Sequence, residues 1–193
     1  MRPALFLDRD GVINLDHGYV HRAEQVDFVP GIFDLGRAAV ARGMPLVVVT
    51  NQAGIGRGLY TEADFHRLMD WMRGIFAAAG APILAVEFCP DHPQHGLGGY
   101  RRENPRRKPG PGMILDAAAA HGLDLAGSVL VGDRATDAEA ARRAGIGAPV
   151  LVTEDPAEAA LAPPGTRVLP SVAMAAAWLA TWSPSSTPAS PKA

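Results

Sequence analysis

The 193-residue sequence has a single cysteine, Cys89, which excludes a framework of internal disulfides. It has no uninterrupted apolar run long enough to span a bilayer, and no leader in which basic residues precede an apolar stretch. Its charges nearly cancel, with 18 Lys and Arg against 20 Asp and Glu, which gives no overall attraction to nucleic acid or to an anionic membrane. We therefore expect a cytoplasmic protein that binds neither. We also expect a monomer, because no amphipathic extension or exposed apolar stripe is evident.

The sequence does contain material for a core, because 48% of its residues are hydrophobic. Short runs of apolar and β-branched residues predict buried strands at 4–7, 45–49, 83–88, 128–131, 149–152 and 167–169. Segments typical of helices lie between them, at 31–43, 61–80, 111–122 and 135–145. Strands that alternate with helices of this length predict an α/β fold with a mainly parallel sheet covered on both faces.

Two stretches depart from this alternation. Residues 90–111 are rich in Gly, Pro, His and Arg and are too long for a routine connection, which favours a functional role. Residues 181–193 are rich in Ser, Pro and Ala and offer too little apolar area to order themselves. We therefore expect one folded domain over 1–180 and a disordered tail over 181–193.

Polar side chains follow three of the predicted strands at the point where each strand ends. Asp8 and Asp10 follow the first strand, Thr50 and Asn51 follow the second, and Asp133 follows the fourth. Ligands of parallel sheets bind beyond the carboxyl ends of the strands, so these groups should converge. Carboxylates placed together repel one another unless a cation joins them, and hard oxygen ligands without a Cys/His set favour Mg²⁺.

Such a constellation indicates phosphoryl transfer. Magnesium prefers phosphate oxygens as its remaining partners, and Thr50 and Lys108 could supply a hydrogen bond and a positive charge to the same phosphoryl group. No serine or cysteine lies beside a base in the sequence pattern, so the natural nucleophile is a carboxylate. Asp8 would attack phosphorus, and Asp10 would protonate the leaving alkoxide and later accept a proton from water.

Four ordered segments, DRDGVIN, TNQ, RKP and GDRATD, resemble the motifs of the haloacid dehalogenase (HAD) superfamily of phosphotransferases. Longer segments, among them LDRDGVINLDHGYVH, VVVTNQAGIGRGLYTEADF and RRKPGPGM, resemble the D-glycero-D-manno-heptose 1,7-bisphosphate 7-phosphatases within it. The resemblance covers residues 4–153. It implies a Rossmann-like three-layer sandwich without a large cap domain, a sugar bisphosphate as the small-molecule partner, and a role in making ADP- or GDP-heptose precursors of lipopolysaccharide core or surface glycans.

The resemblance also implies a role for each matching residue. Asp8 is the expected nucleophile and Asp10 the acid/base, and Asp8, the backbone carbonyl of Asp10 and Asp133 are the expected Mg²⁺ ligands. Thr50 and Lys108 are expected to steady the transferring phosphoryl group. The expected substrate contacts are Asp16, His17, Gly18, Tyr19, Asn51, Gln52 and Arg107.

The sequence departs from this family at a zinc site. Many relatives hold zinc with Cys-x-His and Cys-x-Cys pairs, and the corresponding positions here are Cys89, Asp91, Asn104 and Arg106. One thiolate with one carboxylate is a poor zinc set, so we expect no zinc. His92 and His95 do not offer a tetrahedral set either. We expect prolines and ion pairs to hold the 90–111 loop instead.

Other interpretations of these features stay open at the level of sequence. An Asp-x-Asp pair on its own is commonly a solvated turn, and Thr50 and Asn51 could simply cap a loop. The GIGRG segment at 54–58 lacks the spacing of a nucleotide-binding loop and is expected to be a flexible connection. The competing functions are a histidinol-phosphate phosphatase and a non-catalytic binding protein on the same fold; the first is disfavoured by the DHGYVH segment and the second by the retained carboxylate pair.

Overall fold

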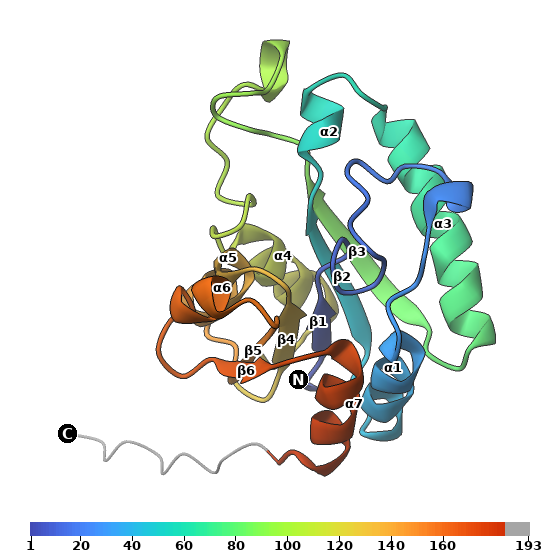
Figure 1. Ribbon diagram of the computed structural model, residues 1–193, viewed down its shortest axis with the longest axis vertical. Helices are drawn as coiled ribbons and strands as arrows, with labels where there is room; N and C mark the ends of the chain where they lie inside the picture. The colour runs from blue at the N-terminus through green and yellow to red at the C-terminus, as the bar shows by residue number, and fades with distance from the viewer. Residues whose placement is uncertain (184–193) are drawn as a thin grey trace.

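The computed structural model describes residues 1–183 and contains a six-stranded parallel sheet between layers of helices (Figure 1). The strands lie in the order β3-β2-β1-β4-β5-β6, and each neighbouring pair is parallel. Their bounds are β1 (Leu5–Leu7), β2 (Leu46–Asn51), β3 (Ile83–Cys89), β4 (Val129–Gly132), β5 (Ala148–Val152) and β6 (Arg167–Leu169). All six predicted strands and the Rossmann-like α/β fold are thus confirmed.

The central strands form continuous apolar runs because both faces of the sheet are buried. In β1, Leu5 and Leu7 pack into one core cluster and Phe6 into the other, and none of the three is exposed to solvent. β2 and β4 alternate in the same way. This period-two pattern therefore builds two cores, one on each side of a single sheet.

Five helices of ten or more residues cover the sheet. Residues of α1 (Ile32–Ala41), α3 (Glu62–Ala78) and α7 (Val172–Thr181) contribute to one core, and those of α4 (Gly112–His121) and α5 (Ala135–Ala144) to the other. α3 begins where the sequence predicts, because the Thr61 side chain accepts a hydrogen bond from the Asp64 amide while Asp64 accepts one from the Thr61 amide. The three-layer arrangement is confirmed.

Several short elements were not predicted from the sequence. The GIGRG segment, expected to be a flexible connection, begins within α2 (Ala53–Gly56). Two 3-10 turns, η1 (Ala23–Gln25) and η2 (Gly98–Tyr100), and the helix α6 (Pro156–Ala160) complete the described chain. The predicted tail begins at 181, whereas α7 extends to Thr181 and the Trp182 ring lies 5.6 Å from that of Trp178. The rest of the predicted tail, 184–193, lies outside the described residues.

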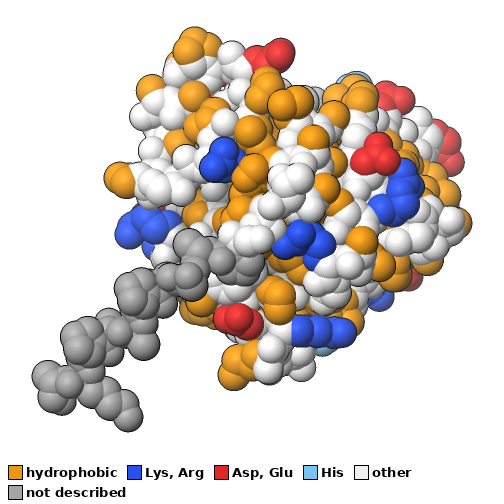
Figure 2. All heavy atoms as spheres, turned by 90° about the horizontal axis from the view of Figure 1, so that it is seen from below, with side chains coloured by type: hydrophobic (Ala, Val, Ile, Leu, Met, Phe, Trp, Pro, Cys, Tyr) orange, Lys and Arg blue, Asp and Glu red, His pale blue; other side chains and the backbone are white. Residues whose placement is uncertain are grey.

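The face at the amino ends of the strands carries a mixture of side-chain types. Seen from below, side chains of both charge signs are interspersed there with hydrophobic ones (Figure 2). Within residues 1–183, no helix combines the length and apolarity that crossing a bilayer requires.

Strand order determines where a ligand can enter. From β1 the chain proceeds through β2 to β3 on one side, and β4, β5 and β6 lie on the other. The helices that follow β1 and β4 therefore diverge to opposite faces, which leaves a crevice beyond the ends of these two strands. Residues 90–111 extend from the end of β3 beside α2 at this same edge (Figure 1).

Candidate active site

A cavity of about 430 Å³ opens at the carboxyl ends of β1, β2 and β4. Every predicted site residue lines it except His17. The His17 ring is turned to Asp27, with Nε2 2.8 Å from Asp27 Oδ2. The structure therefore brings together groups from three strand ends and from the 90–111 loop, as the strand-end argument predicts.

Asp8 and Lys108 form the base of this cavity. Asp8 directly follows β1, and its amide donates to the Val131 carbonyl of β4. Lys108 Nζ lies 2.7 Å from Asp8 Oδ1 and 2.6 Å from Asp137 Oδ1. Burial raises the pKa of Asp8 to about 6, although Lys108 opposes that shift. Burial also disfavours the charge of Lys108, but Asp137 and Asp8 outweigh it and raise the Lys108 pKa.

The carboxylates of Asp8, Asp133 and Asp137 gather beside this lysine. Each places an oxygen within 4.8 Å of the other two. Burial, together with Asp8 and Asp137, raises the pKa of Asp133 to about 8. Its Oδ1 is buried without a hydrogen-bond partner. An orphaned carboxylate oxygen among other hard oxygen donors fits a divalent cation such as Mg²⁺.

Two glycines permit this close packing of acids. Gly11 has a φ of +89°, and a Cβ there would lie 2.3 Å from Asp133 Oδ2. A Cβ on Gly132 would lie 2.2 Å from the Asp137 Cβ. Any larger residue at either position would push an acid out of the cluster, which explains the glycine after Asp10 and the one before Asp133.

The end of β2 supplies a hydroxyl and an amide. Thr50 is buried, and its Oγ1 accepts a hydrogen bond from Gln52 Nε2 at 2.9 Å. The Asn51 side chain is bonded twice to the Lys108 backbone, accepting from its amide at 3.0 Å and donating to its carbonyl at 3.2 Å. Asn51 thereby fixes the segment that delivers Lys108, in addition to lining the cavity where substrate contact was predicted.

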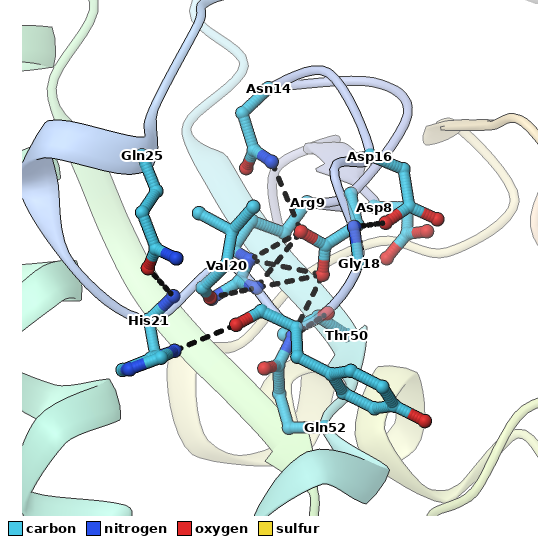
Figure 3. A network of polar contacts seen from close by, with 12 residues as sticks. Asp8, Arg9, Asn14, Asp16, Gly18, Val20, His21, Gln25, Thr50 and Gln52 are labelled. Atoms are coloured by element: carbon cyan, nitrogen blue, oxygen red, sulfur yellow. Dashed lines mark hydrogen bonds and ion pairs between the residues drawn. The ribbon is translucent and has the colours of Figure 1, made fainter. Parts of the chain in front are cut away.

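Three side chains, labelled Arg9, Asn14 and Gln52 in Figure 3, converge on the Asp10 carboxylate. This carboxylate accepts hydrogen bonds from Arg9, from Asn14 Nδ2 at 3.0 Å and from Gln52 Nε2 at 3.1 Å. Gln52 in turn accepts a hydrogen bond from the Tyr60 hydroxyl at 2.5 Å. Burial, the largest cause, raises the pKa of Tyr60 to about 12, so this hydroxyl stays a donor.

Ion pairs hold the 90–111 loop, as predicted, together with hydrogen bonds. Asp91 is fully buried and accepts from Arg102 Nε at 2.8 Å and from Asn104 Nδ2 at 2.5 Å. Arg106 Nη2 pairs with Glu87 at 2.6 Å. Three of the four positions at which the resemblance implies zinc ligands, Asp91, Asn104 and Arg106, thus form hydrogen bonds or ion pairs with neighbouring side chains.

Sequence reasoning missed three residues of this network. Arg9 is fully buried, which is rare for an arginine and could not be expected from the pattern. Tyr60 lines the cavity from the turn before α3. Asp137 is not among the predicted site residues; its position four residues after Asp133 was the available signal for a further acid at the site.

Comparisons with known proteins agree with this geometry. The HAD-hydrolase-like family model matches residues 105–175. A D-glycero-alpha-D-manno-heptose-1,7-bisphosphate 7-phosphatase from Burkholderia mallei is 57% identical over 78% of this chain and 80% of its own length. A D-glycero-beta-D-manno-heptose-1,7-bisphosphate 7-phosphatase from Vibrio cholerae is 48% identical over 78% of this chain and 81% of its own.

A solved structure extends the similarity to three dimensions. The D,D-heptose 1,7-bisphosphate phosphatase from B. bronchiseptica, complexed with magnesium and phosphate, has a TM-score of 0.79 and 34% sequence identity. The match covers 93% of this chain and 98% of that one. By sequence and by structure, therefore, the chain belongs to the HAD superfamily and, within it, to the family of heptose 1,7-bisphosphate 7-phosphatases, which are phosphoric monoester hydrolases.

Proposed function

We propose that this protein is a Mg²⁺-dependent phosphatase that removes the 7-phosphate of D-glycero-D-manno-heptose 1,7-bisphosphate through an aspartyl-phosphate intermediate. The observation that carries the proposal is the Asp8 carboxylate at the base of the cavity, 2.7 Å from the Lys108 ammonium. A buried carboxylate beside a fixed cation is suited to attack phosphorus while the cation faces the phosphoryl oxygens. The names of the similar proteins support the substrate.

The reaction takes two steps on this chain. In the first, an Asp8 oxygen forms a bond to phosphorus, the bond from phosphorus to the sugar oxygen breaks, and the Asp10 carboxyl gives its proton to that oxygen. In the second, Asp10 takes a proton from a water molecule, the water oxygen bonds to phosphorus, and the bond to Asp8 breaks. Lys108 and Thr50 hold the phosphoryl oxygens in both steps. Inorganic phosphate leaves and Asp8 is restored.

The acidic cluster would hold the metal beside these groups. Asp8, Asp133 and the Asp10 carbonyl are the proposed ligands, and the Asp137 carboxylate lies close enough to contribute. The chemistry supplied by bound Mg²⁺ is neutralisation of charge on the phosphoryl oxygens. The similar structure complexed with magnesium and phosphate supports this assignment.

Mg²⁺ should stabilise the metal-free protein more at pH 8 than at pH 6. The pKa of Asp133 is raised to about 8 and that of Asp8 to about 6, in each case chiefly by burial. Unfolding lowers both pKa values, so the free energy of unfolding falls as the pH rises from about 4 to 8. Magnesium binds the ionised carboxylates and offsets this loss. We expect an increase in melting temperature of roughly 5 to 10 °C at pH 8 with Mg²⁺ at about 100 times its Kd.

Thermal melts of chelator-treated protein with and without Mg²⁺, at both pH values, check this expectation. Asp133→Asn keeps the shape of the side chain but removes a proposed ligand, and should abolish the Mg²⁺ response. An equal response in wild type and variant would contradict the metal site.

The substrate assignment is tested by phosphate release from a panel. The panel holds both anomers of heptose 1,7-bisphosphate, heptose 1-phosphate and histidinol phosphate, each assayed with and without chelator. We expect kcat/KM for one bisphosphate anomer to exceed that for histidinol phosphate by about 100-fold or more. Histidinol phosphate lacks the sugar hydroxyls and the second phosphate, so it would leave polar groups of the pocket without hydrogen-bond partners. Arg107 lines the cavity and would contact the second phosphate.

Two results would overturn the proposal. A preference for histidinol phosphate would indicate the other branch of the superfamily. No phosphate release from any substrate, with Mg²⁺ present and the fold intact, would indicate a binding protein. If the panel supports the proposal, the reaction belongs to the supply of ADP- or GDP-heptose precursors. The preferred anomer then shows which of these two nucleotide sugars the product supplies.

A further inference from the structure

Arg9 separates the two candidate catalytic aspartates in sequence, and no part of it is exposed to solvent. It is among the largest fully buried side chains of the described residues. Its guanidinium carbon lies 5.8 Å from the centre of the Phe65 ring. An arginine in such a place loses its hydration and is tolerated only if its contacts compensate.

Asp10 provides most of that compensation. Arg9 Nη2 lies 2.9 Å from Asp10 Oδ1 and 2.8 Å from Oδ2, and Nε lies 3.2 Å from each. The edge of the guanidinium formed by Nε and Nη2 therefore faces both carboxylate oxygens, an arrangement that a lysine cannot reproduce. Asp10 is the only carboxylate among the described residues that pairs with this arginine.

The same guanidinium also holds the segment that was predicted to contact substrate. Arg9 Nη2 donates to the Val20 carbonyl at 2.8 Å (Figure 3). At the other end of this segment, Asn14 Nδ2 donates to Asp10 Oδ1 and to the Leu15 carbonyl. The loop from 14 to 20 is thus fastened at both ends to the Asp10 carboxylate, at one end through Arg9.

The backbone of this loop needs such support. Tyr19 lines the cavity with a φ of +54°, the only positive φ of a non-glycine residue in the described chain. That conformation is unfavourable for a residue with a Cβ and persists where neighbouring contacts hold it. The Arg9 contact falls on the next residue, Val20, which is completely buried.

We infer that Arg9 is a positioning residue, which acts through Asp10 by fixing the direction of its carboxyl and by coupling it to the loop that bears Tyr19. A buried ion pair is by itself weak evidence for stability, because apolar residues of similar volume often replace one at no loss. The contacts on both Asp10 oxygens and on Val20 instead favour control of geometry. The inference rests on the proposed function in that Asp10 is taken as the acid/base.

Leaving groups of different acidity separate this role from a purely structural one. A sugar phosphate expels an alkoxide that needs a proton from Asp10, whereas p-nitrophenyl phosphate expels a phenolate that does not. The ratio kcat/KM reports the steps through transfer of the phosphoryl group to Asp8, and so excludes hydrolysis of the intermediate. We expect Arg9→Met to lower kcat/KM by about 100-fold for the heptose bisphosphate and by less than about 5-fold for p-nitrophenyl phosphate.

Three further variants test whether the effect passes through Asp10. Asp10→Asn should give the same selective loss, and the double variant Arg9→Met/Asp10→Asn should lose no more than Asp10→Asn alone. Arg9→Lys keeps the charge and most of the volume, and should retain the fold while showing a smaller loss of the same selectivity. Arg143→Met, at the exposed last turn of α5, is the matched control and should change neither substrate.

The outcomes distinguish the inference from the proposed function. Equal losses on the two substrates, or additive losses in the double variant, would overturn the positioning role while leaving the phosphatase assignment intact. If Arg9→Met does not fold, as judged by circular dichroism, Arg9→Lys and the double variant Arg9→Lys/Asp10→Asn take its place. Their losses of kcat/KM on the two substrates are then compared in the same way. If wild type hydrolyses p-nitrophenyl phosphate and another sugar phosphate but not the heptose bisphosphate, the substrate proposal fails, and that sugar phosphate serves for the Arg9 test. Wild type inactive on every phosphate would overturn both.

Discussion

Asp8→Asn should reduce phosphate release by at least about 10⁴-fold, which is in the range found when a catalytic nucleophile is removed. The amide nitrogen and oxygen that replace the carboxylate cannot form a stable bond to phosphorus. Thr50 is not placed to take over, because its hydroxyl accepts a hydrogen bond from the Gln52 amide and forms no side-chain hydrogen bond to a base among residues 1–183. The loss should appear in kcat for every phosphate ester the enzyme accepts.

The fold of this variant should persist. Asn has nearly the shape of Asp, and burial already disfavours the charged form of Asp8, whose pKa is raised to about 6. Lys108 keeps its contact with Asp137 at 2.6 Å after the change. We therefore expect a melting temperature close to that of wild type.

Two measurements check this prediction. Steady-state phosphate release compares Asp8→Asn with Asp70→Asn, a matched change at an exposed position on α3 that should have no effect. Acid-quenched wild-type enzyme should also yield a phosphorylated peptide containing Asp8. Substantial turnover by Asp8→Asn, or an adduct on a different residue, would rule out Asp8 as the nucleophile.

Strands β1, β2, β4 and β5 could be predicted because each is a short run that is buried almost throughout. The edge strands β3 and β6 are partly exposed and were indicated by their short apolar runs alone. α6 and α7 were not predicted because neither shows a helical hydrophobic period: α6 has only five residues, and α7 is apolar almost throughout. The tight helix α2 begins at Ala53 directly after Gln52, and glycines 54 and 56 obscured it since glycine disfavours helices in isolation. Tertiary packing rather than propensity sets α2, whose last three residues are buried.

The candidate site was predictable to the extent that strand ends dictate it. Asp8, Thr50 and Asp133 converge because three parallel strands end at one edge of the sheet. The orientation of the Asp10 side chain was not predictable, because it depends on the buried Arg9. Arginine side chains are mostly exposed, so the sequence alone would place Arg9 in solvent. Nor could sequence spacing show that Lys108 reaches across to the Val49 carbonyl, at 3.0 Å, from an irregular loop.

Lys108→Met should be the second most damaging change at the site. The ammonium is nearly fully buried and lies between two carboxylates. It would face the charge that develops on the phosphoryl group, and loss of one such preorganised donor costs about 2 to 4 kcal/mol of transition-state stabilisation, or roughly 30- to 1000-fold in kcat. The change also leaves Asp8 and Asp137 without their common counter-charge, so the melting temperature should fall as well.

A double variant separates these two effects. Lys108→Met/Asp137→Asn removes one of the stranded carboxylates, so it should recover part of the lost melting temperature, while kcat should stay as low as in Lys108→Met because the cation is still missing. Melting curves and phosphate release on wild type, both single variants and the double variant form a complete cycle. If activity returned together with stability, Lys108 would act by keeping the acids in place. If stability returns alone while Asp137→Asn by itself stays active, the lysine contributes its charge to the phosphoryl group beside Asp8.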